Sequence, residues 1–234
     1  MSDTTTVNQA YFNKLASEYD QKFQKTVARL QDEVKSRASL LGARPSARLL
    51  DYACGTGLLS SALGPLISEC VGIDVSESMV EQYNAKAKSE GLPPSKRFAY
   101  VGNLVSEEDP SPAAFSSPNF FDFDIAGVGF AFHHMDDCEL AAKRLAERLR
   151  PGGVLFIAEF LAHAPMEGHT ASSGVRHHGF TQDRMREIFE GAGVGKDFQF
   201  DVMDEDINFE HAHGQGKHMM RRVFFARGEK DSHP

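Results

Sequence analysis

The sequence predicts an α/β protein with a doubly wound, mostly parallel sheet of seven strands, helices on both faces and an antiparallel C-terminal hairpin strand. Short apolar segments alternate with segments of helical periodicity along most of the chain, and this alternation is typical of parallel sheets. The last two apolar segments have no helix between them. We therefore expect these two strands to pair as an antiparallel hairpin at one edge of the sheet.

The first helical pattern covers residues 9–41, where apolar side chains recur at spacings of three, four and seven. Gly42 and Pro45 end this helix, and the polar residues 1–8 before it are expected to be loose. The strands expected after it are 48–52, 69–75, 97–101, 121–130, 154–160, 198–203 and 220–226. The helices expected between these strands are 58–66, 77–89, 138–149 and 181–192.

The remaining segments are rich in polar residues, Gly and Pro, and are expected to be turns and loops: 106–119, 150–153, 161–180 and 204–218. The length of 234 residues suits one large domain, which we place at residues 9–228, followed by a polar tail at 229–234.

The composition indicates which kinds of partner and which compartment suit this domain. The net charge is 25 − 33 = −8 without a strong basic cluster, so binding to nucleic acid phosphates is not expected. Cys54, Cys70 and Cys138 are odd in number and scattered, which argues against a disulfide framework and fits a reducing compartment. The N-terminus has no apolar signal core, and no run approaches the ~20 apolar residues of a membrane span. These features favour a cytoplasmic protein without a membrane partner.

The most informative segment, residues 49–60, reads LLDYACGTGLLS and joins the strand at 48–52 to the next helix. Gly55 and Gly57 can adopt backbone angles that other residues avoid, and they leave the backbone bare for a ligand. Asp51 ends the strand, and Asp74 ends the next strand 23 residues later. An acid at about this distance commonly accepts hydrogen bonds from ribose hydroxyls.

This loop alone leaves a nicotinamide, a flavin or S-adenosylmethionine as the ligand. A dinucleotide-binding loop carries a third glycine where this chain has Ser60, which disfavours a dehydrogenase. Four patterns in register resemble those of the class I S-adenosylmethionine-dependent methyltransferases, particularly the small ubiquinone/menaquinone-biosynthesis type. They are the segments 50–57 and 71–79, Phe123-Asp124 followed by His133-His134, and the turn 149–155.

The resemblance implies S-adenosylmethionine as the cofactor, a small-molecule substrate, and a lid formed by the helix at 9–41. It places the cofactor against Asp51, Ala53, Cys54, Gly55, Gly57, Asp74, Val75, Met79, Asn103, Leu104 and Gly127. It places the substrate beside Tyr11, Tyr19, Phe130 and His177. From the residues alone, Asp51 could instead cap the turn that follows it.

The histidines are candidates for the remaining chemistry. Methyl transfer is an in-line displacement in which positioning supplies much of the catalysis, and a neutral His can remove the acceptor's proton near pH 7. The candidate bases are His133, His134 and His178. No metal is expected, although His211-x-His213 is the pattern that could hold one. The competing hypothesis is a catalytically silent, cofactor-binding regulator of a partner protein. The methyl acceptor and the oligomeric state are not predicted.

Overall fold

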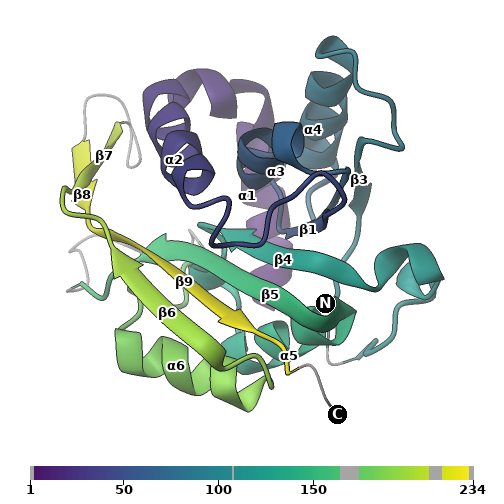
Figure 1. Cartoon of the computed structure of the whole chain (residues 1–234). Helices are drawn as coiled ribbons and strands as arrows, with labels where there is room; N and C mark the ends of the chain where they lie inside the picture. The colour runs from purple at the N-terminus through teal and green to yellow at the C-terminus, as the bar shows by residue number, and fades with distance from the viewer. Residues whose placement is uncertain (1–2, 107, 164–173, 211–217, 232–234) are drawn as a thin grey trace.

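The computed structural model describes residues 3–106, 108–163, 174–210 and 218–231. Within these residues, the main sheet has seven strands in the order β3-β2-β1-β4-β5-β9-β6 (Figure 1). All neighbours from β3 to β5 are parallel, whereas β9 is antiparallel to both β5 and β6. The predicted fold class is therefore confirmed. The strands are β1 (Arg48–Tyr52), β2 (Glu69–Asp74), β3 (Arg97–Val101), β4 (Phe123–Gly129), β5 (Leu149–Phe160), β6 (Lys196–Val202) and β9 (Val223–Glu229).

Helices cover both faces of this sheet. Figure 1 shows α2, α3 and α4 on one side and α5 and α6 on the other. Their bounds are α2 (Gln24–Ser36), α3 (Leu58–Leu63), α4 (Glu77–Ser89), α5 (Cys138–Arg148) and α6 (Gln182–Gly191). Because the central strands are covered twice, β1 and β4 are buried along nearly their whole length.

The N-terminal helical region differs from the single helix expected at 9–41. Helix α1 (Asp3–Lys22) begins six residues earlier, and the chain breaks at Phe23 before α2 starts. The two helices serve different surfaces, since α1 packs on α4 while α2 packs on α3. Apolar periodicity continues through the break, so the sequence pattern does not reveal it. Residues 3–8 are helical, and Asn8 among them is buried and hydrogen-bonded to the distant His134 carbonyl.

Two further boundaries differ for local reasons. The turn expected at 150–153 is an irregularity inside β5, where pairing with β4 jumps from Phe123↔Leu149 to Ile125↔Val154. The strand expected at 220–226 is split at Arg222, because its first part belongs to another sheet.

That second sheet is a hairpin of two short strands, β7 (Ile207–Glu210) and β8 (His218–Arg221). The polar pattern at 204–218 hides β7, which is only four residues long. Thr26 of α2 donates a hydrogen bond from Oγ1 to the Asn208 carbonyl over 2.8 Å. In Figure 1 the hairpin stands beside α2, beyond the end of the main sheet. It can therefore contribute side chains to a site at that end.

The loop at residues 53–57, here called the glycine loop, packs on tightly spaced side chains, and this packing predicts the effect of a substitution on stability. A Cβ at Gly72 in β2 would lie 2.8 Å from the Ala99 Cβ and 2.9 Å from the Cys54 Sγ. Gly72→Ala should therefore destabilise the protein by about 1–3 kcal/mol through overpacking. Gly191→Ala is the matched control, because a Cβ there meets nothing within 4 Å; it should be neutral or stabilising by up to ~1 kcal/mol. Urea unfolding measures both, and equal effects would contradict this packing.

Candidate active site

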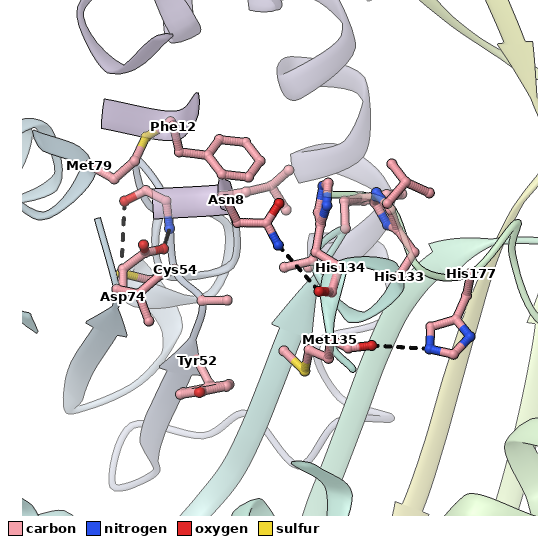
Figure 2. A pocket seen from close by; sticks show the side chains of 18 of the residues that line it. Asn8, Phe12, Tyr52, Cys54, Asp74, Met79, His133, His134, Met135 and His177 are labelled. Atoms are coloured by element: carbon pink, nitrogen blue, oxygen red, sulfur yellow. Dashed lines mark hydrogen bonds between the residues drawn. The ribbon is translucent and has the colours of Figure 1, made fainter. Parts of the chain in front are cut away.

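A cavity of about 700 Å³ follows the carboxyl ends of four neighbouring strands. Its lining includes the last residues of β1, β2, β4 and β5, which are Tyr52, Asp74, Gly129 and Phe160. The strand order reverses between β1 and β4, and ligands of open α/β sheets bind at such switch points. Figure 2 shows the glycine-loop side chains on one side of the cavity and the histidines on the other.

The glycine loop presents bare backbone to this cavity. Ala53 and Gly55 line it and have positive φ angles of 52° and 50°. A Cβ at Gly55 would meet nothing within 4 Å, so the space beside its backbone is open to a ligand. Gly57 has a φ of 93° but does not line the cavity; its neighbour is the Tyr83 ring. Burial raises the pKa of the Cys54 thiol well above its usual value, so this cysteine is not a nucleophile at neutral pH.

Asp74 ends β2 and is held by the loop. Its two carboxylate oxygens accept hydrogen bonds from the Gly55 amide over 2.8 Å and the Ser76 amide over 2.9 Å (Figure 2 shows Asp74 in the cavity wall). A carboxylate has about four acceptor positions, and the Val75 amide also interacts with this one, so acceptor capacity remains for a ligand. Burial raises the pKa of Asp74 because it removes the carboxylate from water. Hydrogen bonds from the hydroxyl groups of a ligand would offset this loss of hydration.

Asp51 takes a different position. Its side chain lies beneath the loop, where one oxygen accepts from the Ser60 amide over 3.0 Å and the Ser60 hydroxyl over 2.7 Å. The Tyr83 hydroxyl in turn donates to the Ser60 hydroxyl. Asp51 therefore caps the first turn of α3 and not the turn directly after the strand, and it does not line the cavity as the expected cofactor contact would require. Burial raises the pKa of Asp51 to about 7.

The structure brings most of the expected cofactor and substrate residues together and separates a few. Leu104 is buried in the core, Gly127 faces Leu59, and Tyr11 lies on the exposed side of α1. None of these three lines the cavity. The expected residues that do line it are Ala53, Cys54, Gly55, Asp74, Val75, Met79, Asn103, Tyr19, Phe130, His133, His134, His177 and His178.

Helix α1 lies over the cofactor side of the cavity and is fastened there by polar contacts. The Asn13 side-chain oxygen accepts a hydrogen bond from the Ser76 hydroxyl over 2.6 Å. Asp20 accepts one from the Thr56 hydroxyl over 2.5 Å and one from Lys86 over 3.1 Å. These bonds tie α1 to the glycine loop, to α4 and to the residue that precedes α4.

On the other side of the cavity, His133 pairs with a buried acid. It follows β4 in a short 3-10 helix (Phe132–His134), and its Nδ1 lies 2.7 Å from Oε2 of Glu159 in β5. The same oxygen accepts the His133 amide, while Oε1 accepts the Phe160 amide over 2.8 Å. Glu159 is fully buried. Because an ionised carboxylate can only accept hydrogen bonds, Nδ1 keeps its proton and donates a hydrogen bond to Glu159. The free lone pair of the neutral ring is therefore on Nε2. Sequence reasoning missed Glu159, although an acid inside an apolar strand was a usable signal.

His134 differs from its neighbour. Burial, and then the proximity of His133, lower the pKa of His134 to about 3, so this ring stays neutral and cannot hold an extra proton near pH 7. Its Nδ1 lies 3.0 Å from the Gly174 carbonyl. His177 and His178 line the cavity farther along, and His177 Nε2 lies 3.0 Å from the Met135 carbonyl (Figure 2). Among the three candidate bases, His133 therefore has the geometry that suits proton transfer best.

A family model described as a methyltransferase domain matches residues 18–195. The chain belongs to this family. The membership confirms the resemblance to class I S-adenosylmethionine-dependent methyltransferases and decides against the dehydrogenase alternative.

Relatives of this chain include an uncharacterized methyltransferase of Schizosaccharomyces pombe, 35% identical over 153 residues that cover 62% of this chain and 52% of that protein. The ubiquinone/menaquinone biosynthesis C-methyltransferase UbiE of a Shewanella species is 32% identical over 122 residues, which cover 51% of this chain and 45% of that protein. The chain thus spans about half the length of the curated relatives it matches. The magnesium protoporphyrin IX methyltransferase of Synechocystis, solved with bound S-adenosylmethionine, shares the fold with a TM-score of 0.64 at 17% identity, over 99% of both chains.

The described residues contain neither a metal-binding cluster nor a membrane-spanning helix. No three or more His, Cys, Asp or Glu side chains among them are grouped to hold a metal ion. His169, His211 and His213 lie outside the described residues. No helix in the same part of the chain is both long enough and apolar enough to cross a membrane.

The buried Asp51 carboxyl predicts a pH dependence of stability. Its pKa in the folded protein, about 7, exceeds the ordinary value of 3.8, so its contribution to the stability of the fold is fully present below about pH 4 and is lost as pH rises through 7. The melting temperature of Asp51→Asn should therefore rise relative to the wild type between about pH 5 and about pH 8. Thermal melts across this range measure the difference, and a constant difference would contradict the buried-acid assignment.

Proposed function

We propose that this methyltransferase transfers the methyl group of S-adenosylmethionine to a small-molecule acceptor whose proton is removed by His133. The observation that carries this proposal is the single cavity that joins two sets of groups. Bare backbone and a carboxylate stand on one side of it, and the His133–Glu159 pair stands on the other.

The residues on the first side fit the cofactor. The open space beside Gly55 suits its amino-acid end, which needs close approach to backbone amides. Asp74 has acceptor capacity left for ribose hydroxyls, besides the bonds it accepts from backbone amides. Val75 and Met79 provide apolar surface for the adenine, and Asn103 lies at the same end of the cavity wall as Tyr52, whose hydroxyl donates to its side-chain oxygen over 2.9 Å.

When bound, S-adenosylmethionine supplies a methyl group on a sulfonium, so that sulfur keeps the carbon–sulfur electron pair as the acceptor forms its new bond to carbon. The protein's part is to align the acceptor, which can supply roughly 7–11 kcal/mol of the barrier reduction. The acceptor's proton passes to Nε2 of His133. Glu159 then stabilises the resulting imidazolium through Nδ1, over the 2.7 Å contact.

The alternative is a regulator that binds the cofactor without catalysis, which should have a closed substrate pocket or an extended apolar patch. The continuous cavity and the paired His133 support the enzyme instead. The three cysteines are free and buried, which fits a reducing compartment, and we place the protein in the cytoplasm. The negative net charge of −8 supports a small molecule rather than nucleic acid as the substrate.

Asp74→Ala should weaken binding of S-adenosylmethionine and S-adenosylhomocysteine by about 10- to 100-fold, because hydrogen bonds to a charged acceptor are lost. Calorimetric titration measures both affinities, and the circular dichroism spectrum checks folding. Asp204→Asn, at an exposed carboxyl, is the control and should bind like the wild type. Unchanged affinity in a folded Asp74→Ala protein would remove Asp74 from the cofactor site.

His133→Asn should lower kcat by about 10²- to 10⁴-fold near pH 7, the usual contribution of a general base. The KM for S-adenosylmethionine should stay the same. Glu159→Gln should lower kcat by less, because its amide oxygen can still orient the ring without balancing its charge. As pH exceeds the acceptor's own pKa, the deficit of His133→Asn should shrink. A deficit that is constant with pH would instead indicate a purely structural role.

A further inference from the structure

The histidine side of the cavity extends into an aromatic surface that the cofactor does not need. Phe130, Phe160 and Phe209, here called the aromatic wall, all line the cavity. Their ring centroids are 5.1–6.2 Å apart, and the Phe160–Phe209 pair meets edge to face at 83°. The His133 ring lies 5.2 Å from Phe160. The proton-accepting group is therefore adjacent to this wall.

Three separate parts of the chain build the aromatic wall. Phe130 follows β4, Phe160 ends β5, and Phe209 comes from β7 of the hairpin outside the main sheet. Phe130 has a φ of 57°, an unfavourable backbone angle for a bulky residue that typically marks a functional site. Its amide is held by the Ala158 carbonyl over 2.9 Å, which maintains the ring beside the cavity.

The surroundings of the wall are largely apolar as well. Leu30 of α2 and Met219 of β8 belong to the same apolar cluster as the three rings and also line the cavity, which the polar Thr26 and Arg221 line as well. The hydrogen bond from Thr26 to Asn208 fixes the hairpin against α2. An acceptor beside His133 would therefore lie next to the Phe160 ring and the aromatic wall to which it belongs.

We propose that the methyl acceptor is an aromatic ring bearing a hydroxyl group, which packs on the aromatic wall and directs its oxygen at His133. This proposal rests on the proposed function and names its substrate class. Offset and edge-to-face contacts with Phe rings favour an aromatic body. A ring hydroxyl has a pKa near 10, as in Tyr, far below that of an aliphatic alcohol, so a general base removes its proton more readily. The O–H proton goes to Nε2, the oxygen lone pair forms the O–CH₃ bond, and sulfur keeps the electron pair of the broken bond.

The test compares 2-naphthol with its saturated counterpart, trans-decahydro-2-naphthol, by calorimetry in the presence of S-adenosylhomocysteine. The wild type should bind 2-naphthol at least about tenfold more tightly, as expected from several ring contacts. Phe209→Leu keeps an apolar side chain but removes one ring, so it should weaken 2-naphthol alone by about 2- to 10-fold. Met220→Leu is the matched control on the same hairpin, because Met220 is 51% exposed, and it should leave both affinities unchanged.

Equal binding of the two compounds by the wild type would overturn the proposal, as would equal weakening of both by Phe209→Leu. If Phe209→Leu does not fold, Phe209→Trp provides a second test by fluorescence, because the wild-type chain has no Trp and all Trp emission would come from position 209. A saturating concentration of 2-naphthol should change the fluorescence of this Trp, and no change would contradict the aromatic wall as the binding site of the ring.

Labelled methyl transfer distinguishes failure of the proposed function from failure of the proposed substrate class. Preferential binding without methylation refutes the proposed function alone, whereas methylation of aliphatic acceptors with no preference for 2-naphthol refutes the aromatic class alone.

Discussion

The hydrogen bond from the Gly55 amide to Asp74 is the contact on which the cofactor side of the site depends. It joins the loop after β1 to the end of β2 over 2.8 Å, so one carboxylate both shapes the loop and faces the cavity. Beneath the loop, Asp51 and Ser60 hold the start of α3. The two acids that the motif places at the ends of neighbouring strands thus have different surroundings. Asp74 faces the cavity, and Asp51 is buried beneath the loop.

The N-terminal helices connect this half to the acceptor half. Helix α1 is bonded to the glycine loop through Asp20 and Thr56. Near its start, Asn8 donates hydrogen bonds to the carbonyls of His134 and Gly174 on the opposite side. Figure 2 shows Asn8 between the cofactor-side residues and the histidines. Helix α2 then supports the β7–β8 hairpin and its part of the aromatic wall. Residues of α1 and α2 therefore line both halves of the cavity.

The sequence predicts the sheet and the glycine loop well because their patterns are local. Alternating apolar segments specify the strands, and Gly55 and Asp74 follow from spacing within one βαβ unit. Contacts between distant segments are less predictable. The Glu159 partner of His133 comes from another strand, and Phe209 comes from a four-residue strand inside a polar segment. Asp51 shows the opposite case, since the spacing that suggests a ligand contact also suits a buried helix cap.

The central claim is that this protein moves a methyl group, and product mass measures that directly. The purified chain would be incubated with methyl-deuterated S-adenosylmethionine and separate pools of phenols, aliphatic alcohols, thiols and amines. The account predicts a product that carries the labelled methyl group, formed by the wild type and strongly reduced in His133→Asn. Binding of the cofactor with no labelled product from any pool would contradict it and favour the regulator.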